Sequence, residues 1–256
     1  MRQIAIHQAR RSQKSPRARR VWITGLLFLL TGGAALPAKA RKHVEGFAAP
    51  ARPAPAGLAA DKGRFRIMTG GQQVGKEDFE IAQNGANWVA RGTSEVKGAD
   101  GVTHVTGTLE LHPDGTPAHY EWSTQGAKKA SASIGFNGPT ATINLVVGGA
   151  RPFTQQFTFK EPLIAVLDNN LYHQYAILAR LYDWNKKGTQ TFSVLVPQEM
   201  TPGSVTVESL GPQDVEGKKL DELRVKTEDL ELDLYLENQR LVRIDAPNAN
   251  AEIVRE

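Results

Sequence analysis

The 256-residue chain is long enough for one large domain or two small ones, and its formal net charge is +4. Residues 1–40 hold eight Lys or Arg and no acid, so the remainder carries 23 basic against 27 acidic residues. The basic excess therefore belongs to the leader and does not indicate nucleic-acid binding. The absence of cysteine excludes disulfides, thiolate metal sites and a cysteine nucleophile.

Residues 1–40 show the order of charge and hydropathy that is typical of an export signal. The basic stretch "RRSQKSPRARR" precedes the apolar "VWITGLLFLLTGGAAL", and "AKA" at 38–40 fits a small-residue cleavage site. The apolar run is short for a membrane span of ~20 residues, so we favour cleavage after Ala40 over retention as an anchor. "RRVWI" at 19–23 partly resembles a twin-arginine signal, which leaves the export route open. We expect an exported protein, periplasmic or secreted, that contacts the membrane only through an uncleaved signal.

An Ala- and Pro-rich linker is predicted for residues 41–63, because this stretch offers few backbone donors and little to bury. Residues 64–256 are predicted to form a single β-rich domain. Its first half alternates apolar and polar residues between Gly-containing turns, and the apolar members are Phe65, Ile67, Phe79, Ile81, Trp88, Ala90, Leu109, Leu111, Tyr120 and Trp122. This alternation predicts a curved antiparallel sheet, either a β-roll or a half-barrel, with one face covered and one in water.

The segment "LDNNLYHQYAILARLYDWNKKG" at 167–188 is the strongest candidate for a helix. We predict one buried central helix near 169–183, capped by the side chain of Asp168, Asn169 or Asn170. At the helical period one apolar stripe collects Leu171, Tyr175, Leu178 and Tyr182. Such a helix would fill the concave side of the sheet. Further along the chain, "EDLELDLYLENQRLVRIDAP" predicts a hairpin whose leucines face one way and whose acids face the other.

The same segment holds the candidate ligand-binding residues, which are Asp168, Asn169, Asn170, His173, Tyr175 and Arg180. Amides at a helix N-terminus could receive an anion, and a histidine one turn beyond a carboxylate could be polarised by it. We favour a structural reading, in which the acid or amides cap the helix and His173 bonds a neighbouring strand. No HExxH, calcium-loop, GxSxG or phosphate-loop pattern occurs, so no catalytic residue, metal or cofactor is predicted.

Two stretches carry a resemblance to a known group of proteins. "RIMTGGQQVGKEDFEI" with "NWVARGTSEV" resembles the opening hairpins of exported bacterial domains of unknown function, and the 167–199 stretch resembles the central helix-and-strand signature of one such family. The resemblance implies a spiral β-roll or half-barrel, loosely similar to lipoprotein-carrier domains. It offers no catalytic residues to transfer, and lipid carriage is an analogy at the level of the fold.

Three functions are compatible with these features. The first is an envelope binding module that holds an apolar small molecule, a lipid or a partner protein's strand on its concave face or edge. The second is a hydrolase that uses His173 with Asp168, and the third is a purely structural envelope component. We favour a non-enzymatic function. The shape of the concave face distinguishes a carrier, which needs an open apolar groove, from a scaffold.

Overall fold

The structure is a computed structural model that describes residues 57–127, 129–161, 163–186, 188–227 and 230–256. The predicted signal at 1–40 and most of the predicted linker lie outside the described residues. The first strand begins at Asp61, three residues before the predicted start of the domain. The end of the predicted linker is therefore part of the sheet.

Strands dominate the described chain and form one continuous 15-stranded sheet. The first eight strands are β1 (Asp61–Thr69), β2 (Gln72–Asn84), β3 (Asn87–Gly98), β4 (Gly101–Leu111), β5 (Pro117–Gln125), β6 (Ala130–Asn137), β7 (Thr140–Val147) and β8 (Phe153–Thr158). The others are β9 (Ile164–Val166), β10 (Gln190–Val196), β11 (Thr201–Val215), β12 (Lys218–Lys226), β13 (Glu231–Glu237), β14 (Arg240–Ala246) and β15 (Ala251–Arg255), with a 3₁₀ turn, η1 (Pro247–Ala249), before the last.

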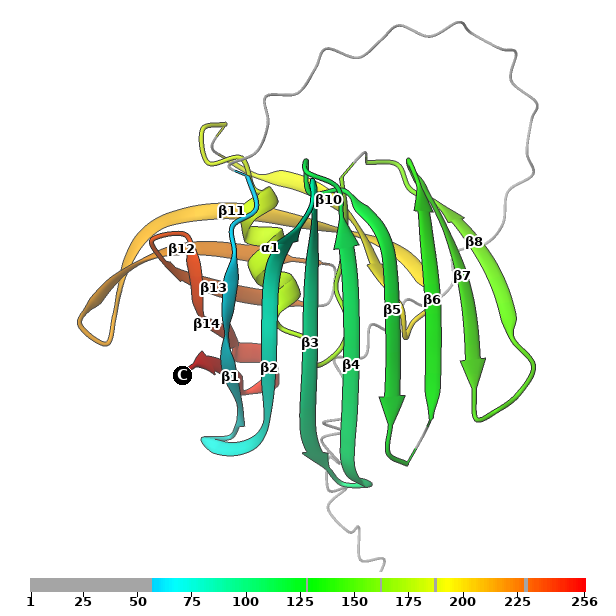
Figure 1. Ribbon diagram of the computed structural model, residues 1–256. Coiled ribbons are helices and arrows are strands. Elements are labelled where there is room, and N and C mark those ends of the chain that lie inside the picture. The colour runs from blue at the N-terminus through cyan, green and yellow to red at the C-terminus, as the bar shows by residue number, and fades with distance from the viewer. Residues whose placement is uncertain (1–56, 128, 162, 187, 228–229) are drawn as a thin grey trace, which may run out of the picture.

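Two arms make up this sheet, and they meet where the first strand pairs with the last. The spatial order runs from β8 back to β1, then to β15 and back to β9. In the middle, Phe65 of β1 pairs with Arg255 of β15. Figure 1 shows the N-terminal arm (β1–β8) and the C-terminal arm (β9–β15) curving around the helix α1, which lies between them. The predicted fold class, a mainly β protein with a curved antiparallel sheet and a central helix, is confirmed.

The helix lies in the one parallel connection among the described strands. β9 and β10 are parallel neighbours, and α1 (His173–Leu181) is the crossover between them. Parallel strands need such a crossover, whereas the hairpins elsewhere need only short turns. Nearly every side chain of α1 is buried, including Tyr175, Leu178 and Leu181. The wide apolar arc of the segment thus places the helix inside the roll, where it joins the cores of the two arms.

The predicted start of the helix is wrong by three or four residues. The helix begins at His173, its N-cap is Tyr172, and no side chain of the Asp-Asn-Asn stretch caps it. Asn170 instead has a left-handed backbone with φ of 70°, which asparagine tolerates better than most residues. Leu171 is fully buried ahead of the helix rather than within it. No helix in the described ranges is long and apolar enough to cross a membrane.

Candidate functional site

A carboxylate from β2 takes the place of the missing helix cap. Glu77 is fully buried, and its Oε2 accepts hydrogen bonds from the backbone N–H groups of Tyr172 at 2.8 Å and His173 at 3.3 Å. The first N–H groups of a helix have no partner within the helix, and the positive end of its dipole favours an anion. Glu77 therefore fixes the start of α1 from a position 95 residues earlier in the chain.

The same carboxylate orients an imidazole. Nδ1 of His173 lies 2.5 Å from Oε1 of Glu77, and the ring stacks on Phe79 at 5.8 Å between centroids. A side chain at Gly92 would occupy this place, because a Cβ there would lie 2.5 Å from Cε1 of His173. His173 is 1% exposed, and its Nε2 has no hydrogen-bond partner in the described structure. The buried Oγ of Ser94 also lacks a hydrogen-bond partner there.

A second buried network lies around Asp168. Its carboxylate accepts hydrogen bonds from the Tyr120 hydroxyl and from Nε2 of Gln198, and its backbone N–H donates to Oε1 of Gln174 at 2.5 Å. Gln174 also donates to the Tyr120 hydroxyl at 3.2 Å. Burial raises the pKa of Asp168 well above its ordinary value. Burial, followed by the nearby Asp168, raises the pKa of Tyr120. This network ties the chain before α1 to β5.

The six predicted site residues do not converge on one site. Asp168 and His173 belong to the two networks above, and the partner of His173 is Glu77 rather than Asp168. The backbone N–H of Asn169 donates to Oε1 of Gln198 at 3.4 Å. Tyr175 is 8% exposed within the core, and burial raises its pKa.

Arg180 lies at the other end of the helix, where its Nη1 donates to Oε1 of Gln239 in the β13–β14 turn at 3.1 Å. The arrangement gives His173 an orienting carboxylate but no exposed edge, so no substrate reaches the ring in this conformation. Among the described residues, no three His, Asp or Glu side chains are placed to hold a metal ion. Both hydrogen-bond networks therefore serve to anchor the helix to the sheet.

An apolar part of the concave face remains uncovered at the end of the N-terminal arm. One cross-strand row runs from Trp122 on β5 through Ala132 and Leu145 to Phe153 on β8. Side chains directly opposite each other on antiparallel strands share a face, so Phe153 faces the same side as the buried Ala132. Exposure rises along the row, from 5% at Trp122 and 3% at Ala132 to 56% at Phe153.

The neighbouring row shows the same trend. Ala130 pairs with Val147, which is two residues from Leu145 and therefore on the same face, and Val147 is 51% exposed. Ala130 and Leu145 are partly buried and pack against the core. We call Ala130, Leu145, Val147 and Phe153 the open concave strip. Exposed apolar patches that continue a core commonly mark binding surfaces.

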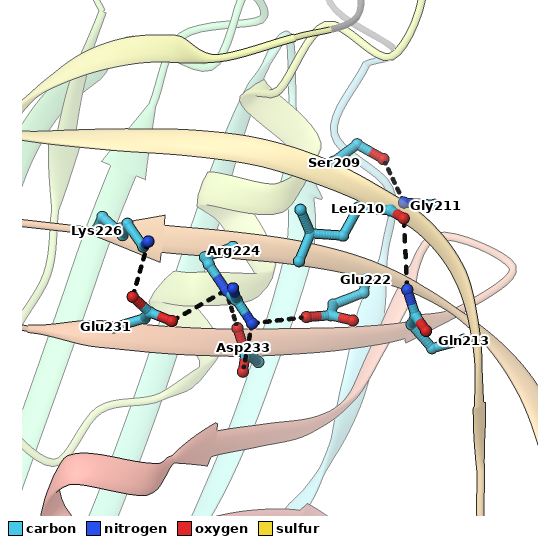
Figure 2. Close-up of polar contacts among 9 residues, drawn as sticks. All are labelled: Ser209, Leu210, Gly211, Gln213, Glu222, Arg224, Lys226, Glu231 and Asp233. Carbon is cyan, nitrogen blue, oxygen red and sulfur yellow. Dashed lines mark hydrogen bonds and ion pairs between the residues drawn. The ribbon is translucent and has the colours of Figure 1, made fainter.

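The convex face of the C-terminal arm carries a charged cluster instead. Arg224 bonds Asp233 through Nε at 2.7 Å and Nη2 at 3.2 Å, and it lies 3.2 Å from Glu231 and 3.5 Å from Glu222. Figure 2 shows the guanidinium surrounded by these three carboxylates, with Lys226 bonded to Glu231. Burial and the neighbouring Asp233 raise the pKa of Glu222. Because the cation is shared among protein carboxylates, the cluster joins β12 to β13 and offers no free positive charge to a ligand.

These features define a class of protein by shape: a curved, open, mostly antiparallel sheet wrapped around one helix. A solved structure described as a β-barrel-like protein of a domain of unknown function, DUF1849, from Brucella abortus has a similar fold. It is 9% identical in sequence, the TM-score is 0.52, and the match covers 78% of this chain and 95% of the other. The expected resemblance to a β-roll domain of unknown function is confirmed at the level of the fold. No protein-family model and no curated protein matches the sequence.

Proposed function

We propose that this protein is an exported binding module of the cell envelope that holds an apolar ligand on the open concave strip. The observation that carries the proposal is the exposure of Phe153 and Val147 on a face whose other apolar side chains in the arm are buried or partly buried. Beneath α1 the same face is filled by the protein's own side chains, such as Leu171 and Leu178. The strip is the part of the face that the helix leaves uncovered. Export is supported by the leader sequence.

Binding should be measured with an environment-sensitive apolar dye, 1-N-phenylnaphthylamine, and with lipid extraction and native mass spectrometry after periplasmic expression. Phe153→Ser with Val147→Ser removes the two exposed apolar side chains of the strip. Burying each of them stabilises a complex by roughly 1.5–3 kcal/mol, so the double variant should bind at least tenfold more weakly.

Val102→Ser is the matched control, because Val102 is also an exposed valine, at 42%. It lies three residues before the inward-facing Val105 on β4 and therefore points to the opposite face of the sheet. The Val102→Ser variant should bind like the unchanged protein. A protein that carries no ligand and does not bind the dye, or a double variant that binds as well as the control, would refute the proposal.

A second candidate function is the pairing of a partner's strand with β8. This strand is one end of the sheet, and its sequence "FTQQFT" holds no charge and no proline, which are common protections of an edge. An extended partner segment could add there by backbone hydrogen bonds. A photo-crosslinker at the exposed Thr154 should then give a discrete adduct in the envelope, whereas one at the exposed Thr93, in the middle of the arm, should not. Equal labelling from both positions would speak against edge pairing.

A further inference from the structure

Two basic residues lie at the rim of the open concave strip. The carbonyl of Lys129 accepts a hydrogen bond from the N–H of Gly148 at 2.8 Å, which places Lys129 beside the residue that follows Val147. Arg151 precedes Phe153 by two positions. Both residues are exposed, and the structure gives neither an ion pair within the described ranges.

Two arginines of the convex face, Arg224 and Arg243, show the opposite arrangement. Arg224 is shared by three carboxylates, and Arg243 lies within 3.4 Å or less of Asp245, Glu216 and Glu252. Cations that the protein itself neutralises have no charge left for a ligand. At the rim of the strip, by contrast, Lys129 and Arg151 have no acidic partner among the described residues, and they border exposed apolar side chains. This combination is complementary to a molecule that is apolar along its length and anionic at one end.

We propose that the ligand is a fatty-acid-like amphiphile, with its single acyl chain on the open concave strip and its carboxylate at Lys129 and Arg151. The strip is three strands wide, about 10 Å at ~4.8 Å between strands, so a single extended acyl chain can lie across it. Arginine and lysine both bind carboxylates, arginine through a planar pair of donors. This assignment rests on the proposed function and adds the headgroup to it.

The test compares dodecanoate with dodecanol, which have the same chain length and differ in charge. Each is titrated calorimetrically into the full-length protein, dodecanoate below its micelle concentration and dodecanol below its solubility limit. Two exposed ion contacts should make dodecanoate bind about tenfold more tightly at low salt. Added salt should reduce this preference, because it screens exposed charges. Lys129→Gln with Arg151→Gln should abolish the preference and leave dodecanol binding unchanged.

The matched control is Lys76→Gln with Arg91→Gln, which makes the same change of net charge on the convex face. Lys76 and Arg91 are exposed and alternate with the buried Glu77 and Gly92. The control should keep the preference for dodecanoate. If both ligands bind equally, if the Lys129/Arg151 variant keeps the preference, or if the control loses it, the headgroup assignment is wrong while the apolar binding function stands. If a folded protein binds neither ligand, the proposed function fails and the assignment fails with it.

Discussion

Gly92 is the position where one added methyl group tests the anchoring of the helix most directly. A Cβ at residue 92 would lie 2.5 Å from Cε1 and 2.7 Å from Nδ1 of His173, and 2.9 Å from Oε1 of Glu77. None of these atoms is free to move away, because both side chains are buried and bonded to each other at 2.5 Å. Gly92→Ala must therefore push the start of α1 away from β3 or break the bond between His173 and Glu77.

Overpacking of a well-filled core by one methyl group costs about 1–3 kcal/mol. In a domain of this size each kcal/mol lowers Tm by roughly 2–4 °C, so urea unfolding and calorimetry both resolve the effect. Gly135 on β6 is the matched control, because it is also a strand glycine but no atom lies within 4 Å of its built Cβ. Gly135→Ala should be neutral or stabilise by about 0.4–1 kcal/mol, since alanine has less freedom in the unfolded chain.

The double variant Gly92→Ala with His173→Ala isolates the contact. Removing the imidazole opens the space that the new methyl group needs, so Gly92→Ala should cost much less in that background. The coupling free energy between the two substitutions should exceed ~1 kcal/mol. If Gly92→Ala and Gly135→Ala had the same effect, or if the two substitutions at 92 and 173 were additive, the described packing of His173 against β3 would be wrong.

Three further predictions follow from the buried and charged groups. Glu77→Ala leaves two backbone N–H groups and the imidazole of His173 without an acceptor and should destabilise by about 3–5 kcal/mol, as measured by urea unfolding; a loss below 1 kcal/mol would contradict the anchoring role. Asp168 has a pKa raised above its ordinary value of 3.8, so its contribution to stability is complete below that value and is lost as pH rises through the folded pKa. Asp168→Asn should accordingly reduce the decline in unfolding free energy between mildly acidic and neutral pH, and an unchanged pH profile would argue against it. Arg224→Leu leaves the buried Asp233 without its cation and should cost about 1–3 kcal/mol at neutral pH and less in acid, in unfolding curves at several pH values; a pH-independent loss would show that the charge is not the cause.

The sheet and the helix could be predicted from the sequence because both depend on local periodicity. The inward positions assigned to Phe79, Ile81, Tyr120 and Trp122 are buried, as the alternation indicated. Alternation is a property of each strand by itself. It therefore also predicted which face of the C-terminal hairpin carries the buried leucines. It contains no information on which strands are neighbours, and the pairing of β1 with β15 therefore came only from the structure.

The expected bond from His173 to a neighbouring strand is present, with Glu77 of β2 as its partner. The cap of the helix was missed because its partner is far away in the chain. Short polar residues just before the helix favour a local cap, but the cap is Glu77, 95 residues from Tyr172. The sequence did hold a signal. Glu77 is in phase with Phe79 and Ile81, so the alternation that placed these two inside also placed an acid inside. A buried acid needs a partner, and the phase of a charged residue is thus as informative as that of an apolar one.

The pairing of β1 with β15 has a consequence for how the chain assembles. The N–H of Glu256 bonds the carbonyl of Arg64 at 2.9 Å, so the two ends of the domain lie side by side in the middle of the sheet. β15 follows every other strand in the chain, and the two arms become one sheet only after it has been made and has found β1. Contacts between residues so distant in sequence form slowly. A circular permutant could link these two ends and place its new termini in the exposed β7–β8 turn. The pairing of β15 with β1 would then be that of a hairpin, and the permutant should fold faster to the same structure.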